Sequence, residues 1–69
     1  MRVLVVEDDP LLAEGLVKVL TRAGHAVDHV ASGKQADMLL TRDDYDLAVL
    51  DVGLPDFDGF EVLRRLRAR

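Results

Sequence analysis

The chain has 69 residues, no cysteine and a formal net charge of −4. The absence of cysteine excludes a disulfide framework and any thiolate metal site, and the negative charge argues against non-specific nucleic-acid binding by this segment. The longest apolar run is far below the roughly 18 residues of a membrane span, and no signal-peptide pattern opens the chain. We therefore expect one small cytoplasmic domain with no membrane partner.

The first predicted strand covers residues 2–6 and is rich in β-branched residues without polar alternation, which is typical of a strand buried on both faces. It runs into three consecutive acids and a proline. A run of acids is often only a solvated turn, but here Asp9 has a structural role as the N-cap of a helix that has Pro10 in its first turn. Glu7 and Asp8 have no such role and remain at the carboxyl end of the strand.

The helix that follows has apolar residues at helical spacing and ends before Gly24. Its expected buried positions are Leu12, Leu16, Val19, Leu20 and Ala23. Residues 26–30 then predict a shorter, more polar strand at the edge of the sheet. His25 and His29 would stand about 13 Å apart along such a strand, so we interpret them as exposed edge residues and not as a metal pair.

A second helix is predicted to begin at the N-cap Ser32 and to bury Ala36, Leu39 and Leu40. A polar connection with several acids then leads into the apolar run Leu47–Leu50, which predicts a strand covered on both faces. Asp51 follows this run directly. In open parallel sheets, ligands bind at the carboxyl ends of the strands, so Asp51 becomes the central candidate for function.

The loop after Asp51 contains Gly53 and Gly59, and Asp58 is a candidate cap for a last helix. That helix is predicted to bury one stripe made of Phe60, Leu63 and Leu66. Its carboxyl end carries four arginines, at positions 64, 65, 67 and 69. Such a cluster could bind nucleic acid, but it also suits a helix C-terminus electrostatically, and we favour a solvated face.

The order of elements is βαβαβα, which predicts a parallel sheet in a three-layer α/β arrangement. Neighbouring strands would bring Glu7, Asp8 and Asp51 within about 5 Å of one another, and each like-charged pair then costs about 3 kcal/mol at an effective dielectric constant near 20. A raised pKa or a cation must offset this repulsion. Oxygen ligands favour a hard cation such as Mg²⁺, beside which a carboxylate is a reasonable phosphoryl acceptor.

Three features occur together in this order: the acids Glu7 and Asp8 after the first strand, Asp51 after the third, and a Leu-Pro…Asp-Gly loop over residues 54–59. In this the chain resembles the receiver domain of bacterial two-component response regulators, most closely the OmpR/PhoB type, which has a flavodoxin-like (CheY-like) fold. The resemblance implies that Asp51 is the phosphoacceptor. It also implies that Asp8 is a direct Mg²⁺ ligand, that Glu7 is mainly a water-mediated one, and that the Gly53 carbonyl is a further ligand.

The resemblance implies further that Pro55 and Gly59 shape the loop without taking part in the chemistry. The phosphoryl donor would be a phosphohistidine on a sensor histidine kinase, which such domains contact with their first helix, here residues 11–23. The chain would not be an enzyme in its own right. It would reach DNA only through an output domain that lies outside this chain, in a parent protein that regulates transcription.

The chain also departs from the family pattern. Receivers of this type have five strands, with a Ser or Thr after the fourth and a Lys after the fifth, whereas this sequence stops after the third helix. Residues 1–69 would thus be a partial receiver domain without the fourth and fifth βα units. Its third strand would expose an unpaired apolar edge, so we expect this chain to form a homo-oligomer.

Two other interpretations of the function of this chain remain open at this stage. A phosphohydrolase of the haloacid-dehalogenase kind also has a nucleophilic aspartate after an apolar strand and uses Mg²⁺. Such an enzyme needs a second acid two residues later, and this chain has Gly53 there. The second alternative is a purely structural fragment that only assembles with copies of itself.

Overall fold

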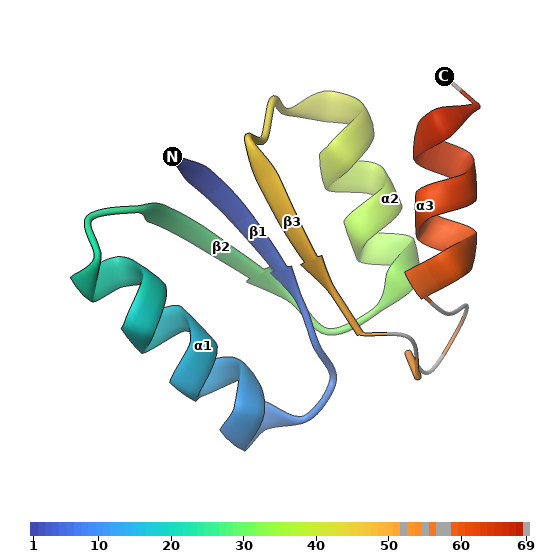
Figure 1. The fold of residues 1–69 in the computed structure, drawn as a ribbon. Coiled ribbons are helices and arrows are strands. Elements are labelled where there is room, and N and C mark those ends of the chain that lie inside the picture. Colours follow the sequence, from blue (N-terminus) through green and yellow to red (C-terminus); the bar gives the residue numbers. More distant parts are fainter. Residues whose placement is uncertain (52, 55, 57–58, 69) are drawn as a thin grey trace.

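The computed structural model describes residues 1–51, 53–54, 56 and 59–68. Its elements alternate between strand and helix (Figure 1): β1 Arg2–Val6, α1 Pro10–Arg22, β2 Ala26–Val30, α2 Gly33–Arg42, β3 Leu47–Leu50 and α3 Gly59–Arg67. The strands form one parallel sheet in the order β2-β1-β3. This confirms the predicted βαβαβα pattern and places the polar strand β2 at an edge. None of the described helices is long and apolar enough to cross a membrane.

The core is built around β1, the central strand, whose residues Val3–Val6 are fully buried. Side chains alternate between the two faces of a strand, so Leu4 and Val6 share one face and Val3 and Val5 the other. Leu4 and Val6 pack in one cluster with Ala36, Leu54 and Val62. The helices α2 and α3 lie side by side on this face of the sheet, and α1 covers the opposite face (Figure 1). The fold therefore has three layers, as predicted.

The caps predicted for α1 and α2 are present. Asp9 Oδ1 accepts from the N–H groups of Leu11 and Leu12, and Pro10 occupies the first turn of α1. Gly24, after the end of α1, has the positive φ of 93° that favours glycine. At the start of α2, Ser32 Oγ accepts from the Gln35 N–H at 3.1 Å. These local signals depend only on neighbouring residues, which explains why the sequence was sufficient to predict them.

The face that α1 buries differs from the predicted one. Ala13 is its only described residue that is fully buried. The positions that are half-buried are Leu16, Val17 and Leu20, and those that are exposed against the prediction are Leu12, Val19 and Ala23. The helix is apolar on more than one side, so two different stripes satisfy helical spacing. Periodicity alone could not select the stripe that contacts the sheet.

Two further burial predictions were wrong. In β3, Leu47 is 45% exposed and the three residues after it are only half-buried. Leu47 and Val49 share the sheet face of their register partners Val3 and Val5, and α1 covers this face mainly over β2 and β1. In α3, Val62 is the buried residue, and of the predicted stripe Leu63 is half-buried whereas Phe60 is 67% and Leu66 is 37% exposed. The stripe predicted for this helix therefore lies to one side of the face that packs on α2.

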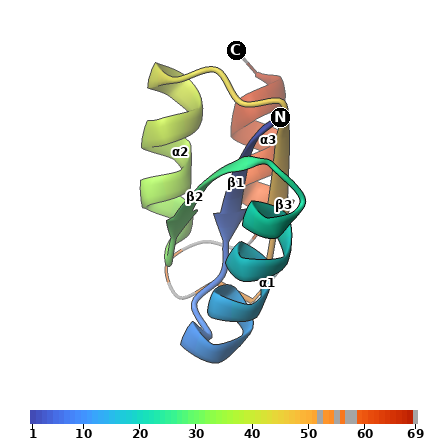
Figure 2. The same ribbon diagram turned by 90° about the vertical axis from the view of Figure 1, so that its left-hand side faces the viewer.

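The acids before β3 are more than a solvated loop. The Arg2 N–H donates to Asp46 Oδ2 at 2.7 Å, and the Asp46 N–H donates to the Arg2 carbonyl at 2.8 Å. Tyr45 packs against the core, and its hydroxyl donates to Asp28 at 2.6 Å while the Arg2 guanidinium lies over its ring. These contacts fix the amino end of β3 against β1. Figures 1 and 2 show that the N-terminus and the last turn of α3 lie at this end of the molecule.

The exposed edge of β3 generates a test of the expected self-association. Among the described residues β3 pairs only with β1, so its other edge presents unpaired N–H and C=O groups beside the exposed side chain of Leu47. We expect Leu47→Lys to weaken association of this chain in sedimentation equilibrium, because lysine opposes edge-to-edge pairing. Leu11→Lys, at a position that is 79% exposed on α1, is the matched control. A purely monomeric chain at micromolar concentration, or a larger effect of Leu11→Lys, would contradict the prediction.

Candidate metal and phosphoacceptor site

The register of the sheet brings Glu7 and Asp51 together. Val6 of β1 is the register partner of Leu50 in β3, and Glu7 and Asp51 are the next residue of each strand. The Asp51 N–H donates to the Val6 carbonyl at 3.0 Å, and the Glu7 N–H donates to the Val30 carbonyl at 3.1 Å. Both backbones are therefore held by hydrogen bonds that extend the sheet. The two side chains start from fixed and adjacent points at its carboxyl edge.

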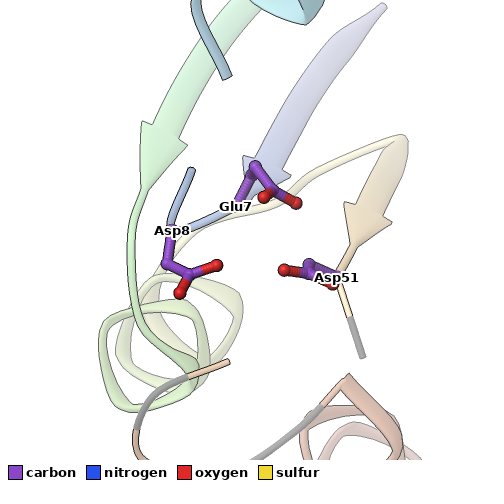
Figure 3. A group of neighbouring side chains, drawn as sticks. All are labelled: Glu7, Asp8 and Asp51. Carbon is purple, nitrogen blue, oxygen red and sulfur yellow. The ribbon is translucent and has the colours of Figure 1, made fainter. Parts of the chain in front are cut away.

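Asp8 completes a cluster of three carboxylates. Glu7, Asp8 and Asp51 each offer an oxygen, and these oxygens all lie within 4.8 Å of one another. Figure 3 shows the carboxylate of Asp51 reaching across from the end of β3 toward those of Glu7 and Asp8 at the end of β1. Glu7 is buried, Asp51 is half-buried and Asp8 is exposed. The structure thus brings together the three acids that the sequence predicted to converge.

Backbone N–H groups orient two of these carboxylates. Glu7 Oε1 accepts from the Asp9 N–H at 3.1 Å, and Asp51 Oδ1 accepts from the Gly53 N–H at 3.1 Å. In each case the donor lies two residues further along the chain, in the turn that leaves the strand. The local turn therefore sets the direction of the acid. Asp9 itself caps α1, which separates it from the cluster as predicted.

His29 is a contact that sequence reasoning missed. Its Nε2 donates to the Glu7 carbonyl oxygen at 2.8 Å, from the neighbouring strand β2. The side chain is exposed, as predicted, but it also fixes the backbone of a site residue. The register of β1 and β2, in which Val5 is the partner of His29, is the signal that could have shown this. That register cannot be read from the sequence of β2 alone.

The electrostatics of the cluster are unfavourable without a counter-charge. Burial raises the pKa of the Glu7 carboxyl above its ordinary value of 4.5, and the negative charges of Asp51 and Asp8 raise it further, although the Asp9 N–H opposes the shift. Oxygen donors of this kind suit a hard divalent cation, and Mg²⁺ is held by a few carboxylates together with water. The residues present fit such an ion. When bound, it would supply the positive charge that the cluster lacks.

The remaining predicted site residues lie in the loop after β3. Gly53 follows Asp51 closely, and a Cβ added to it would be 3.9 Å from Asp51 Oδ1, so space alone does not demand glycine there. Gly59 is the first residue of α3. Pro55, the predicted cap Asp58 and the terminal Arg69 lie outside the described residues. The described arginines of α3 are exposed, and Arg64 and Arg65 both pair with Glu61.

Comparison with known proteins decides the family. Residues 3–69 match the family described as the response regulator receiver domain. The chain belongs to this family. The resemblance that the acidic pair and Asp51 suggested is thereby confirmed, and the haloacid-dehalogenase alternative is set aside.

Among the relatives of this receiver is the transcriptional regulatory protein TcrA of Mycobacterium tuberculosis, with 52% identity over 67 residues, which cover 97% of this chain and 26% of TcrA. The transcriptional regulatory protein PhoP of Escherichia coli is 47% identical over 99% of this chain and 30% of its own length. These relatives confirm the likeness to the OmpR/PhoB type. The chain spans about a quarter to a third of their length.

The response regulator TrrA of Thermotoga maritima, solved in complex with Mg²⁺-BeF, superposes with a TM-score of 0.93 and 34% identity. The match covers 97% of this chain and 58% of TrrA. This likeness confirms the CheY-like, flavodoxin-like fold of the receiver. It also shows that a protein with the same arrangement of strands and helices has been solved with Mg²⁺.

The different tasks of Asp8 and Asp9 give a testable contrast. Asp8→Ala should weaken Mg²⁺ binding, because it removes an oxygen of the cluster, whereas Asp9→Ala should leave the affinity nearly unchanged. Asp9→Ala should instead lower the free energy of unfolding by about 1 kcal/mol, as a lost N-cap. Mg²⁺ titration calorimetry and urea unfolding measure the two effects. Equal Mg²⁺ affinities of the two variants would show that Asp8 does not bind the ion.

The raised pKa of Glu7 predicts how stability depends on pH without metal. A carboxyl whose pKa is higher in the folded than in the unfolded protein stabilises the fold while it is protonated. This contribution is complete below the ordinary pKa of 4.5 and is lost as the pH rises through the higher folded value. Glu7→Gln should therefore be more stable than the unsubstituted protein at neutral pH in EDTA, and the difference should vanish below pH 4.5. Urea unfolding at a series of pH values measures this, and a difference independent of pH would contradict it.

Proposed function

We propose that this receiver accepts a phosphoryl group on Asp51 from a phosphohistidine of a sensor histidine kinase, with Mg²⁺ as cofactor. Glu7, Asp8, Asp51 and the backbone carbonyl of Gly53 would hold the ion. The single observation that carries the proposal is the cluster of three carboxylates, whose oxygens lie within 4.8 Å at the carboxyl edge of the sheet. No structural need for this repulsive arrangement is evident, so we infer a functional one.

The chemistry follows from the position of Asp51. Its carboxylate oxygen would attack the phosphorus atom in line, forming a P–O bond while the P–N bond to the kinase histidine breaks and the electron pair leaves with the imidazole. Half-burial suits this task, because the acid is held by the sheet yet open to an incoming phosphohistidine. The Gly53 N–H holds Asp51 Oδ1, which favours one orientation of the nucleophile. A bound Mg²⁺ would offset the negative charge of the phosphoryl group and of the acids.

The wider role is proposed from the relatives. The matched relatives are transcriptional regulatory proteins of which this chain spans the smaller part, so we propose that residues 1–69 are a partial receiver domain without the fourth and fifth βα units. Contact with DNA would then be made by an output domain outside this chain, in a cytoplasmic protein. Asp51 would be modified by the kinase as a substrate, and we assign the chain no catalytic turnover on other molecules.

Phosphorylation of Asp51 is directly testable. Incubation of the purified protein with acetyl phosphate and Mg²⁺ should give an aspartyl phosphate that mass spectrometry maps to Asp51. Asp51→Asn should abolish the signal, since an amide oxygen is a poor nucleophile, and EDTA should suppress it. The matched control is Asp44→Asn, because Asp44 is an exposed acid at the other end of β3. Labelling of Asp51→Asn at the level of the unsubstituted protein would disprove the assignment.

A further inference from the structure

Asp56 connects the loop after β3 to the beginning of α2. One of its carboxylate oxygens accepts from the Gly33 N–H and the other from the Lys34 N–H, both at 2.8 Å. Gly33 and Lys34 are the first two residues of α2, and N–H groups in the first turn have no partner within their own helix. Hydrogen bonds to an ionised carboxylate are stronger than neutral ones, and the helix dipole adds to them. The contact joins segments more than 20 residues apart in the chain.

The same helix end has a second, local cap. Ser32 Oγ accepts from the Gln35 N–H, so the three donors of the first turn are satisfied from two directions. Ser32 precedes α2 directly and does not belong to the loop after β3. Both caps therefore satisfy N–H groups in the first turn of α2, but only Asp56 also connects the loop after β3 to that helix. This difference allows capping and loop placement to be separated by experiment.

The loop that Asp56 holds contains two of the four proposed metal ligands, Asp51 and the Gly53 carbonyl. Asp51 opens it, the Gly53 N–H donates to Asp51 Oδ1, and Leu54 is 8% exposed in the core cluster beside Ala36 of α2. Asp56 fixes the loop a second time, two residues after Leu54. Gly53 therefore lies between Asp51 at the end of β3 on one side, and on the other the core residue Leu54 and the hydrogen bonds of Asp56 to α2. Its carbonyl position depends on where these contacts place the chain.

We propose that Asp56 is a positioning residue of the metal site, which acts by tying the loop to α2 and so fixing the backbone of Gly53. The inference rests on the proposed function, because it takes Mg²⁺ as the ion and the Gly53 carbonyl as a ligand. Groups that orient a metal ligand without touching the metal commonly matter for its affinity.

The test compares Asp56→Ala with Asp56→Asn and Ser32→Ala. We expect Asp56→Ala to lower the Mg²⁺ affinity about tenfold, the usual scale for loss of an outer-shell partner. Asp56→Asn keeps one amide oxygen as acceptor, so its affinity should lie between those of Asp56→Ala and the unsubstituted protein. Ser32→Ala should leave the Mg²⁺ affinity unchanged although it removes the other cap of α2. Calorimetric titration gives the affinities, and the carbonyl ¹³C shift of Gly53 on Mg²⁺ addition reports the ligand itself.

Several results would overturn the proposal. An equal loss of Mg²⁺ affinity in Ser32→Ala would show that Asp56 acts only as a helix cap. A loss in Asp56→Ala that disappears at high salt would show that Asp56 acts only as a distant negative charge. Unchanged affinity in Asp56→Ala, with normal binding by the unsubstituted protein, would overturn the role of Asp56 alone. Failure of the unsubstituted protein to bind Mg²⁺ would overturn the proposed function and this inference with it. Faster amide exchange at Gly33 and Lys34 in Asp56→Ala confirms in each case that the contact was removed.

Discussion

The repulsion among Glu7, Asp8 and Asp51 is the constraint on which the rest of this molecule depends. Their oxygens lie within 4.8 Å of one another, and at an effective dielectric constant near 20 each charged pair at such a distance costs about 3 kcal/mol. The backbones cannot separate, because the Asp51 N–H and the Glu7 N–H are both bound into the sheet. The strain must therefore be relieved by protonation, which the raised pKa of Glu7 reflects, or by a cation. Any ion that binds here also stabilises the fold through mass action.

The sequence was sufficient for the features that depend on neighbouring residues or on strand order. The caps at Asp9 and Ser32, the ends of the strands and the convergence of Glu7 with Asp51 all follow from such signals. The buried faces of α1 and α3 did not follow, because an apolar residue such as Leu12 or Phe60 satisfies helical spacing whether or not another element covers it. Which side of a helix another element covers is a property of the tertiary arrangement, and the sequence of a single helix does not determine it.

The supporting contacts of the site were the least accessible to sequence reasoning. His29 reaches the Glu7 carbonyl through the register between β1 and β2, and Asp56 reaches the first turn of α2 across more than 20 residues. Both are ordinary polar residues in polar segments, so nothing in their local pattern distinguishes them from solvated side chains. The residues predicted from the sequence are those that would touch the metal or the phosphoryl group. The residues that hold them in place became visible only in three dimensions.

The two ends of the sheet show how the same residue type serves stability at one end and function at the other. Toward the amino end, Tyr45 and Arg2 reach Asp28 in the middle of β2: Asp28 accepts from the Tyr45 hydroxyl and pairs with Arg2, and these partners lower the pKa of its carboxyl. At the carboxyl end, within the part of the chain that the structure describes, no arginine or lysine pairs with Glu7 or Asp51, and the pKa of Glu7 is raised. An acid whose charge the protein already neutralises is satisfied and inert. An acid whose charge the protein leaves uncompensated retains its attraction for a cation, and that residual attraction is what a metal-dependent phosphoacceptor requires.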